Sequence, residues 1–213
     1  MKKLTALLML IFAGNVAFAQ YDQKAKDVLD AMSAKYKKIP AYKASITSAM
    51  INEVDGINEE FGGEITVMGD MYKLDLEEQV VINNGNTVWT YLPDVNEVNI
   101  DTYDPDEDEI SPSKIYTAYQ SGYKYLYVGD ESCNGGNCAV IDLVPNDKDA
   151  QFFKIKLFID KSDYSLRSWT MFDKTGNKYK YSIKNFNSNI NIKPSFFSFD
   201  ATKYPGVEVI DLR

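Results

Sequence analysis

The sequence predicts a mainly β fold: a curved antiparallel sheet that forms an incomplete, half-open barrel, with helices covering its concave side. Apolar and polar residues alternate, as in Phe153–Asp160, with the period of a strand that buries one face. Asn84-Gly85 stands between two apolar runs, which is a strong signal for a hairpin turn. A sheet of about ten or eleven such strands has to curl or close to bury one face.

The first element is an amphipathic helix over Asp22–Lys38, which Pro40 ends. Its apolar residues recur at helical spacing and share one face. They are Ala25, Val28, Leu29, Met32 and Tyr36. This stripe predicts a helix packed on the sheet, and a lid over a cavity has the same pattern.

The strands follow the helix and are joined mostly by hairpin turns. The predicted strands are Tyr42–Val54, Phe61–Met68, Met71–Glu77, Val80–Asn83, Thr87–Leu92, Glu97–Tyr103, Tyr123–Val128, Ala139–Val144, Phe152–Ile159, Leu166–Phe172 and Tyr179–Phe186.

A second helix is predicted between the sixth and seventh strands, after the acidic loop Asp104–Glu109. Ser111-Pro112 places serine at the N-cap and proline at the first helical position. Ile115, Ala118 and Tyr119 share one face, and Gly122 ends the segment. This inserted helix is a second candidate lid.

The N-terminus has the pattern of a secretory signal peptide. Two lysines precede the apolar run Leu4–Phe12, and Ala17–Ala19 is an A-x-A cleavage site. The run is shorter than the roughly 20 residues that span a bilayer. We expect cleavage after Ala19, so that residues 20–213 form a single domain that is secreted or periplasmic.

Charge and residue content exclude several classes of function. The net charge of −8 disfavours nucleic acid and anionic membrane surfaces as partners. The absence of histidine excludes Ser-His-Asp and Cys-His catalysis and most transition-metal sites. The 31 acidic residues leave a glycosidase-type carboxylate pair open, but no pair stands out. We therefore predict no enzyme and no cofactor.

Asp104, Asp106 and Asp108 alternate as calcium ligands do, but the glycine and the bidentate acid of such a loop are missing. We predict a charged loop without metal.

Two cysteines, Cys133 and Cys138, flank the sequence NGGN. In an oxidising compartment this spacing favours a disulfide across a hairpin, worth about 2 kcal/mol for so short a loop. A redox pair or a metal site is the alternative, but the spacing is not C-x-x-C.

The aromatic content is high, with 15 Tyr, 11 Phe and 2 Trp. Each ring alone is best explained as a core residue. Together they supply more apolar surface than one thin core uses, which predicts a cavity.

The hairpin motif resembles the outer-membrane lipoprotein carrier protein family (LolA), in which a strand pair reads (I/V)-x-x-G-x-x-(L/V)-W-x-Y-x-P. The matching residues are Ile82, Gly85, Val88, Trp89, Tyr91 and Pro93, flanked by Gly63, Val67, Tyr72 and Asn96–Val98. The first helix, the inserted helix and the tail Phe197–Val207 also fit this family, so the resemblance covers nearly all of the chain after the signal peptide.

The resemblance implies an incomplete barrel closed by helices over a hydrophobic cavity for acyl chains. It implies a monomeric periplasmic carrier that takes acylated lipoproteins from an inner-membrane lipoprotein-releasing ABC transporter and delivers them to an outer-membrane acceptor or to the membrane itself. The residues expected to line the cavity or its lid are Leu29, Met32, Ile46, Ile65, Val67, Tyr72, Leu74, Trp89, Tyr91, Ile115, Tyr119, Ile155 and Leu157.

The sequence departs from the family at one position. Better-known members have an arginine and a proline before the aromatic residue of the third strand, and the arginine helps to hold the lid closed. Here Val67–Tyr72 contains neither residue. Either another polar group holds the lid, or the cavity is more open. The alternative function is a periplasmic lipid or lipoprotein sensor with the same fold.

Overall fold

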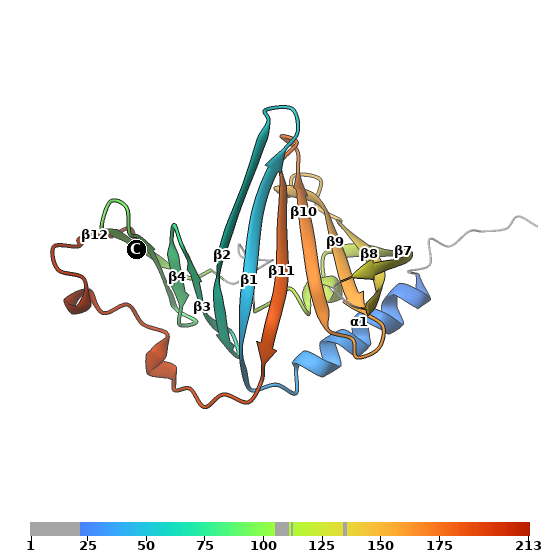
Figure 1. The fold of residues 1–213 in the computed structure, drawn as a ribbon, viewed down its shortest axis with the longest axis horizontal. Helices are drawn as coiled ribbons and strands as arrows, with labels where there is room; N and C mark the ends of the chain where they lie inside the picture. Colours follow the sequence, from blue (N-terminus) through green and yellow to red (C-terminus); the bar gives the residue numbers. More distant parts are fainter. Residues whose placement is uncertain (1–21, 105–110, 112, 134–135) are drawn as a thin grey trace, which may run out of the picture.

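The computed structural model of the chain describes residues 22–104, 111, 113–133 and 136–213. The expected signal peptide and most of the acidic loop, including the candidate calcium ligands Asp106 and Asp108 but not Asp104, lie outside these residues. Figure 1 shows one long helix beside a strongly curved sheet. The helix and strands are α1 (Gln23–Tyr36), β1 (Ala41–Asn52), β2 (Ile57–Met68), β3 (Met71–Leu76), β4 (Val80–Asn83), β5 (Thr87–Leu92), β6 (Glu97–Thr102), β7 (Tyr123–Cys133), β8 (Gly136–Pro145), β9 (Phe152–Asp160), β10 (Leu166–Asp173), β11 (Lys178–Asn187) and β12 (Glu208–Asp211).

The strands form one sheet in the order β12-β6-β5-β4-β3-β2-β1-β11-β10-β9-β8-β7. All neighbours are antiparallel except β12 and β6, which are parallel. The sheet does not close on itself, because β12 and β7 form its two edges. This confirms the predicted mainly β, half-open barrel. Gly69 and Gly85 have φ of 58° and 91° at two of the hairpin turns, a conformation that glycine adopts without strain.

The long strands β1 and β2 pass through the middle of the sheet, and a glycine of β2 permits its close approach to β3. A Cβ on Gly63 would collide with the backbone oxygen of Asp75. Gly63 pairs with Ile46 on one side and with Leu76 on the other. A glycine at such a position lets the strand bend where the backbones come close.

The predicted first helix is confirmed as α1. Asp22 is its N-cap and accepts hydrogen bonds from the backbone amides of Lys24 and Ala25 at 3.0 and 3.2 Å. Ala25, Leu29, Met32 and Tyr36 are buried, as the stripe predicts, and Ser33 is buried with them.

The prediction of an inserted helix is corrected. Residues 113–117 form turns, and only Ala118–Gln120 form a short 3₁₀ helix, η1. Ile115 and Tyr119 are nevertheless buried, with 1% and 5% of their surface exposed. A segment this short gains little from helical hydrogen bonds alone, so the burial of its apolar side chains decides the path of the backbone.

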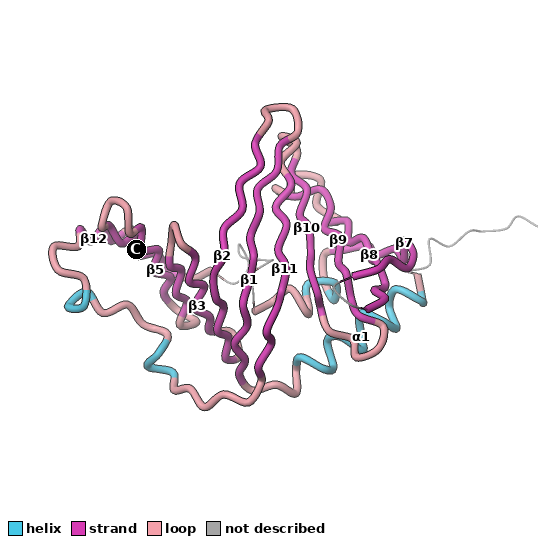
Figure 2. Tube along the Cα trace, in the orientation of Figure 1, coloured by secondary structure: helices cyan, strands magenta, loops and turns pink. Residues whose placement is uncertain are grey.

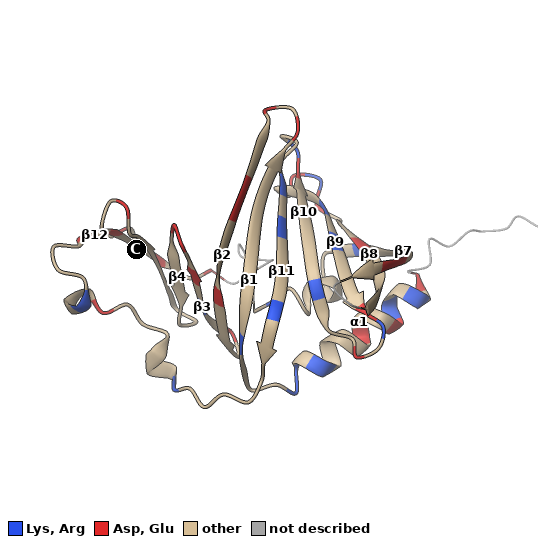
Figure 3. Cartoon of the chain, in the orientation of Figure 1, with Lys and Arg blue, Asp and Glu red and all other residues tan. Residues whose placement is uncertain are grey.

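The two faces of the sheet are covered by different parts of the chain. α1 and the segment 113–120 cover the concave face over β7–β10, and this contact forms the larger apolar core. The C-terminal tail runs as an irregular segment from β11 to β12 (Figure 2) and covers the outer face of β4–β6. Figure 3 shows lysines along β11 and acidic residues along β2, where the outer face is charged.

Candidate functional site

An apolar pocket opens on the concave face, beyond the part of the sheet that α1 covers. Its volume is about 160 Å³. It is lined by Ile46, Tyr72, Leu74, Val81, Trp169, Met171 and Tyr181. The register explains this convergence, because Ile46 and Tyr181 lie on the same face of the central pair β1–β11 and Tyr181 pairs with Trp169. The rings of Trp169 and Tyr181 are stacked, with centroids 4.8 Å apart.

Most of the residues expected at the cavity or its lid lie in the larger core. Those in it or packed against it are Leu29, Met32, Ile46, Ile65, Val67, Tyr72, Leu74, Ile115, Tyr119, Ile155 and Leu157. Ile46, Tyr72 and Leu74 line the apolar pocket. Leu29 and Met32 on α1 and Ile155 and Leu157 on β9 are fully buried where the helix packs on the sheet. They fill this part of the concave face.

Trp89 and Tyr91 do not lie with the other residues that were expected at the cavity. They lie on the outer face, where Trp89 pairs with Ile82 and Tyr91 with Val80. Tyr91 packs on Tyr204 of the C-terminal tail, with ring centroids 4.5 Å apart. Both faces of β5 carry apolar side chains, and alternation alone does not say which face is concave.

Four pocket residues were missed by the sequence analysis: Val81, Trp169, Met171 and Tyr181. Trp169 and Met171 alternate on β10, so the period of two places them on one face. The sequence does not reveal that β11 pairs with β1. This pairing brings the face of β10 that carries Trp169 and Met171 to the same side of the sheet as Ile46.

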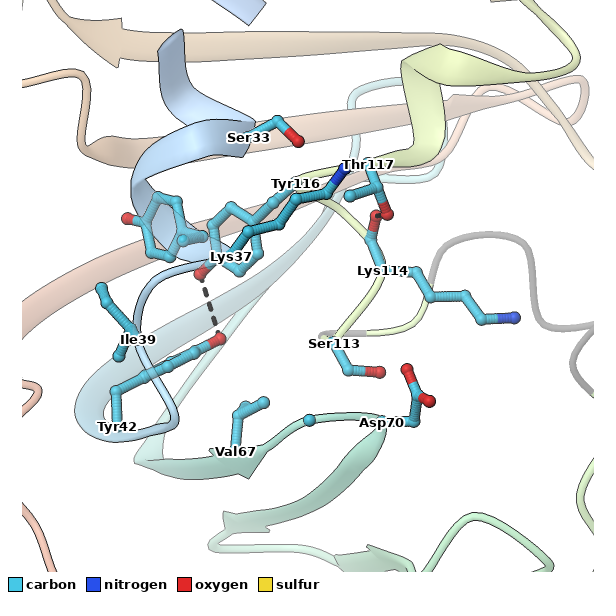
Figure 4. Close-up of a pocket in the computed structure, with 12 residues that line it drawn as sticks. Ser33, Lys37, Ile39, Tyr42, Val67, Asp70, Ser113, Lys114, Tyr116 and Thr117 are labelled. Atoms are coloured by element: carbon cyan, nitrogen blue, oxygen red, sulfur yellow. Dashed lines mark hydrogen bonds between the residues drawn. The ribbon is translucent and has the colours of Figure 1, made fainter. Parts of the chain in front are cut away.

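A second pocket lies at the end of the concave face, where α1, the β2–β3 turn and the segment 113–117 meet (Figure 4). Its volume is about 280 Å³. Its lining mixes aromatic, hydroxyl and charged side chains: Ser33, Tyr36, Lys37, Ile39, Tyr42, Val67, Gly69, Asp70, Ser113, Lys114, Tyr116 and Thr117.

Three tyrosines form the inner wall of this second pocket. The ring of Tyr116 stacks on Tyr36 with centroids 3.5 Å apart, and its hydroxyl lies 3.1 Å from that of Tyr42 (Figure 4). Burial raises the pKa of Tyr36 to about 12, although hydrogen bonds to Leu166 and Tyr116 oppose this rise. Burial also raises the pKa of Tyr42 and of Tyr116. The wall is therefore uncharged at neutral pH.

Polar contacts fasten α1 at both ends and in its middle. At the N-terminus, Asp22 accepts a hydrogen bond from the backbone amide of Tyr127 at 2.9 Å. That bond is the largest contribution to the lowered pKa of Asp22. In the middle, the Tyr119 hydroxyl donates to Asp30 at 2.7 Å, which ties the segment 113–120 to the helix.

At the C-terminal end of α1, the ammonium group of Lys35 lies 2.8 Å from the carboxylate of Asp163 and 2.6 Å from the Ser165 hydroxyl. Burial acts to raise the pKa of Asp163, but the hydrogen bonds from Lys35 and Ser165 outweigh it and lower this pKa to about 2. These contacts fasten the C-terminal end of α1 in a chain that lacks the family's arginine before the third strand.

The structure joins Cys133 and Cys138 in a disulfide between β7 and β8, with Cα atoms 5.8 Å apart. Among the described residues, no group of three or more Cys, Asp or Glu side chains is arranged to hold a metal ion. No helix in the described ranges is long and apolar enough to cross a membrane.

Comparisons with known proteins agree with this geometry. A family model described as outer membrane lipoprotein carrier protein LolA matches residues 75–200, more than half of the chain. No curated protein matches the chain.

Among solved structures, an uncharacterised conserved protein from Thermus thermophilus has 12% identity and a TM-score of 0.58 over 89% of this chain and 99% of that one. This similarity shows the fold. A putative outer membrane lipoprotein-sorting protein domain from Vibrio parahaemolyticus has 13% identity and a TM-score of 0.48, covering 83% of this chain and 97% of that one. A LolA superfamily protein from Nitrosomonas europaea has 11% identity and a TM-score of 0.46, covering 83% and 98%.

The match over more than half of the chain confirms the resemblance seen in the hairpin motif: the chain belongs to the outer membrane lipoprotein carrier protein LolA family.

Proposed function

We propose that this protein is a periplasmic carrier of acylated lipoproteins and that the apolar pocket on its concave face holds their acyl chains. The observation that supports this most directly is the composition of the pocket. Its seven lining residues are all aliphatic, aromatic or methionine side chains, and they lie on the part of the concave face beyond α1. Family membership supports the same function, because the family is described as lipoprotein carriers.

The pocket accommodates only part of a chain in the form described here. Its volume of about 160 Å³ is below the roughly 300–1,000 Å³ that is typical of ligand pockets. A longer segment of chain needs the space now filled by Leu29, Met32, Ile115 and Tyr119, which are buried against the sheet. We infer that α1 and the segment 113–120 act as a lid that moves away when cargo binds.

This exchange gives a carrier the moderate affinity that it needs. Each fully buried methylene contributes about 0.8 kcal/mol, so complete burial of a sixteen-carbon chain approaches 10 kcal/mol or more. Three chains bound so tightly would not be released. If the lid gives up its own apolar contacts as the chain enters, the net gain is smaller and transfer to an acceptor remains feasible. Five methionines follow the expected cleavage site, and their flexible side chains suit acyl chains of different shapes.

The test is a release assay. The purified protein, beginning at Gln20, is mixed with inner-membrane vesicles that hold acyl-labelled lipoprotein and the releasing transporter, and ATP is added. We expect label to appear in the soluble fraction as a 1:1 complex. Release of no label, with binding of a hydrophobic probe retained, favours the lipid-sensor alternative. Loss of both release and probe binding contradicts the pocket itself.

A matched pair of variants links the assay to the pocket. Leu74 and Lys73 are neighbours on β3 and lie on opposite faces, because Leu74 lines the pocket and side chains alternate. Leu74→Gln should reduce complex formation, whereas Lys73→Gln should leave it unchanged. Equal effects of the two substitutions would exclude this face as the binding surface.

A further inference from the structure

The second pocket has a chemistry that acyl-chain binding alone does not explain. It is larger than the apolar pocket, about 280 against about 160 Å³. Serine and threonine hydroxyls line it, from Ser33, Ser113 and Thr117. Three charged side chains also line it: Lys37 and Lys114, which are positive, and Asp70, which is negative. The ammonium group of Lys114 lies 5.6 Å from the centre of the Tyr103 ring. A site made of hydroxyls and both signs of charge is suited to a polar ligand.

Lys37 and Asp70 lie on opposite sides of this pocket. Figure 4 shows Lys37 reaching from the end of α1 along one side, and Asp70 in the β2–β3 turn on the other. Neither the ammonium group of Lys37 nor the carboxylate of Asp70 makes an ion pair or a hydrogen bond with another described residue. Some other surface charges are paired, such as Lys43 with Glu64 at 2.5 Å and Lys35 with Asp163 at 2.8 Å.

The two pockets are consecutive along one face of the sheet. Tyr42 lines the hydroxyl-rich pocket and Ile46 the apolar one, and both lie on the concave face of β1. Four residues of a strand span about 13 Å. Between them, Val67 of the hydroxyl-rich pocket pairs directly with Tyr72 of the apolar pocket. A single amphiphile can therefore place its chain in the apolar pocket and its polar end in the other.

We propose that the hydroxyl-rich pocket binds the zwitterionic head group of an amphiphile, with its anionic oxygens at Lys37 and its ammonium group at Asp70. The ligand class is a phosphoethanolamine-type lipid. This proposal rests on the proposed function, because the chain of the same molecule occupies the apolar pocket. The inner wall supports it, since the uncharged Tyr36, Tyr42 and Tyr116 contribute no competing charge.

The test compares three amphiphiles that share one palmitoyl chain. Lysophosphatidylethanolamine is zwitterionic, lysophosphatidylglycerol is anionic, and monopalmitoylglycerol is neutral. Dissociation constants are measured by calorimetry below the critical micelle concentration for the wild type, Lys37→Gln, Asp70→Asn and the control Lys38→Gln. Lys38 is the exposed neighbour of Lys37 and does not line the pocket.

The expected result is a pattern of signs. For lysophosphatidylethanolamine, both Lys37→Gln and Asp70→Asn weaken binding about three- to fivefold, as suits charge pairs with exposed side chains. For lysophosphatidylglycerol, Lys37→Gln weakens binding while Asp70→Asn strengthens it, because a repulsive charge is removed. Binding of monopalmitoylglycerol is unchanged in both variants, and Lys38→Gln has no effect on any ligand.

Two results overturn the proposal. If Asp70→Asn strengthens binding of lysophosphatidylethanolamine, the pocket favours anions only. If all three amphiphiles bind and no variant discriminates among them, the head group lies outside the pocket while chain binding stands. Failure of the proposed function has a different signature, because then none of the amphiphiles binds the wild type. The dissociation constant of free phosphoethanolamine is measured as well, to distinguish a lipid head-group site from a site for the soluble compound. The proposal requires that free phosphoethanolamine bind far more weakly than lysophosphatidylethanolamine.

Discussion

Replacing Leu29 by alanine tests whether α1 and the segment 113–120 are a movable lid or a permanent part of the core. Leu29 is 0% exposed on α1. The substitution removes three carbon groups, worth about 2.4 kcal/mol at about 0.8 kcal/mol each. The cavity left behind adds to this, so we expect the free energy of unfolding to fall by about 2–5 kcal/mol.

The lid mechanism adds an expectation for ligand affinity that a fixed core does not share. If α1 lifts when an acyl chain binds, the contacts of Leu29 are absent from the bound form. Leu29→Ala then destabilises only the closed, empty form, and the affinity for an acyl probe rises by up to about fiftyfold for 2.4 kcal/mol.

The assay pairs urea unfolding with fluorescence titration of an acyl probe. The control is Val98→Ala, because Val98 is 0% exposed but lies on strand β6 under the C-terminal tail, away from α1. It should lose stability without a gain in affinity. Loss of stability in Leu29→Ala with unchanged or weaker probe binding would refute the lid mechanism.

Three further predictions follow from other contacts. The side chain of Phe197, in the C-terminal tail, is 0% exposed, so Phe197→Ala should lower the free energy of unfolding in urea by about 3–5 kcal/mol. It should leave the affinity for the acyl probe unchanged, since the tail lies on the outer face. Because the pKa of Asp163 is lowered from 3.8 to about 2, its contribution to stability is present above pH 4 and is lost as the pH falls towards 2. The stability difference between wild type and Asp163→Asn should therefore shrink over this range of pH, and a constant difference would show that its contact with Lys35 does not depend on charge. Replacing Cys133 and Cys138 by serine should lower the free energy of unfolding by about 2 kcal/mol, and a change near zero would contradict the chain-entropy argument.

Much of the fold could be predicted because local signals agree with the final structure. Asn84-Gly85 forms a hairpin turn, and the stripe Ala25–Tyr36 becomes the buried face of α1. β12 was not among the predicted strands. It is four residues long and pairs with β6, more than 100 residues earlier in the chain. No local sequence pattern predicts such a distant pairing.

The lining of the apolar pocket could be predicted only in part: Ile46, Tyr72 and Leu74 were expected there, and the other four residues were not. Alternation places Trp89 and Tyr91 together on one face of β5, but only the folded sheet decides that this face is the outer one. Likewise, Lys37, Asp70 and Thr117 belong to three segments that no sequence pattern connects. Tertiary packing at the mouth of the half-barrel brings them together.

The pairing of β1 with β11 has a consequence for how the chain reaches its native state. β1 to β6 form one run of antiparallel neighbours, and β7 to β11 form another. Each run pairs strands that are close in sequence, whereas Ile46 meets Ile183 across the seam between them. Such non-local closure is slow, because the entropy of a long loop is lost before the contacts form. The apolar pocket takes Ile46, Tyr72 and Leu74 from the first run and Trp169, Met171 and Tyr181 from the second, so it exists only after this seam closes. Under the proposed function, binding of an acyl chain therefore reports that folding is complete.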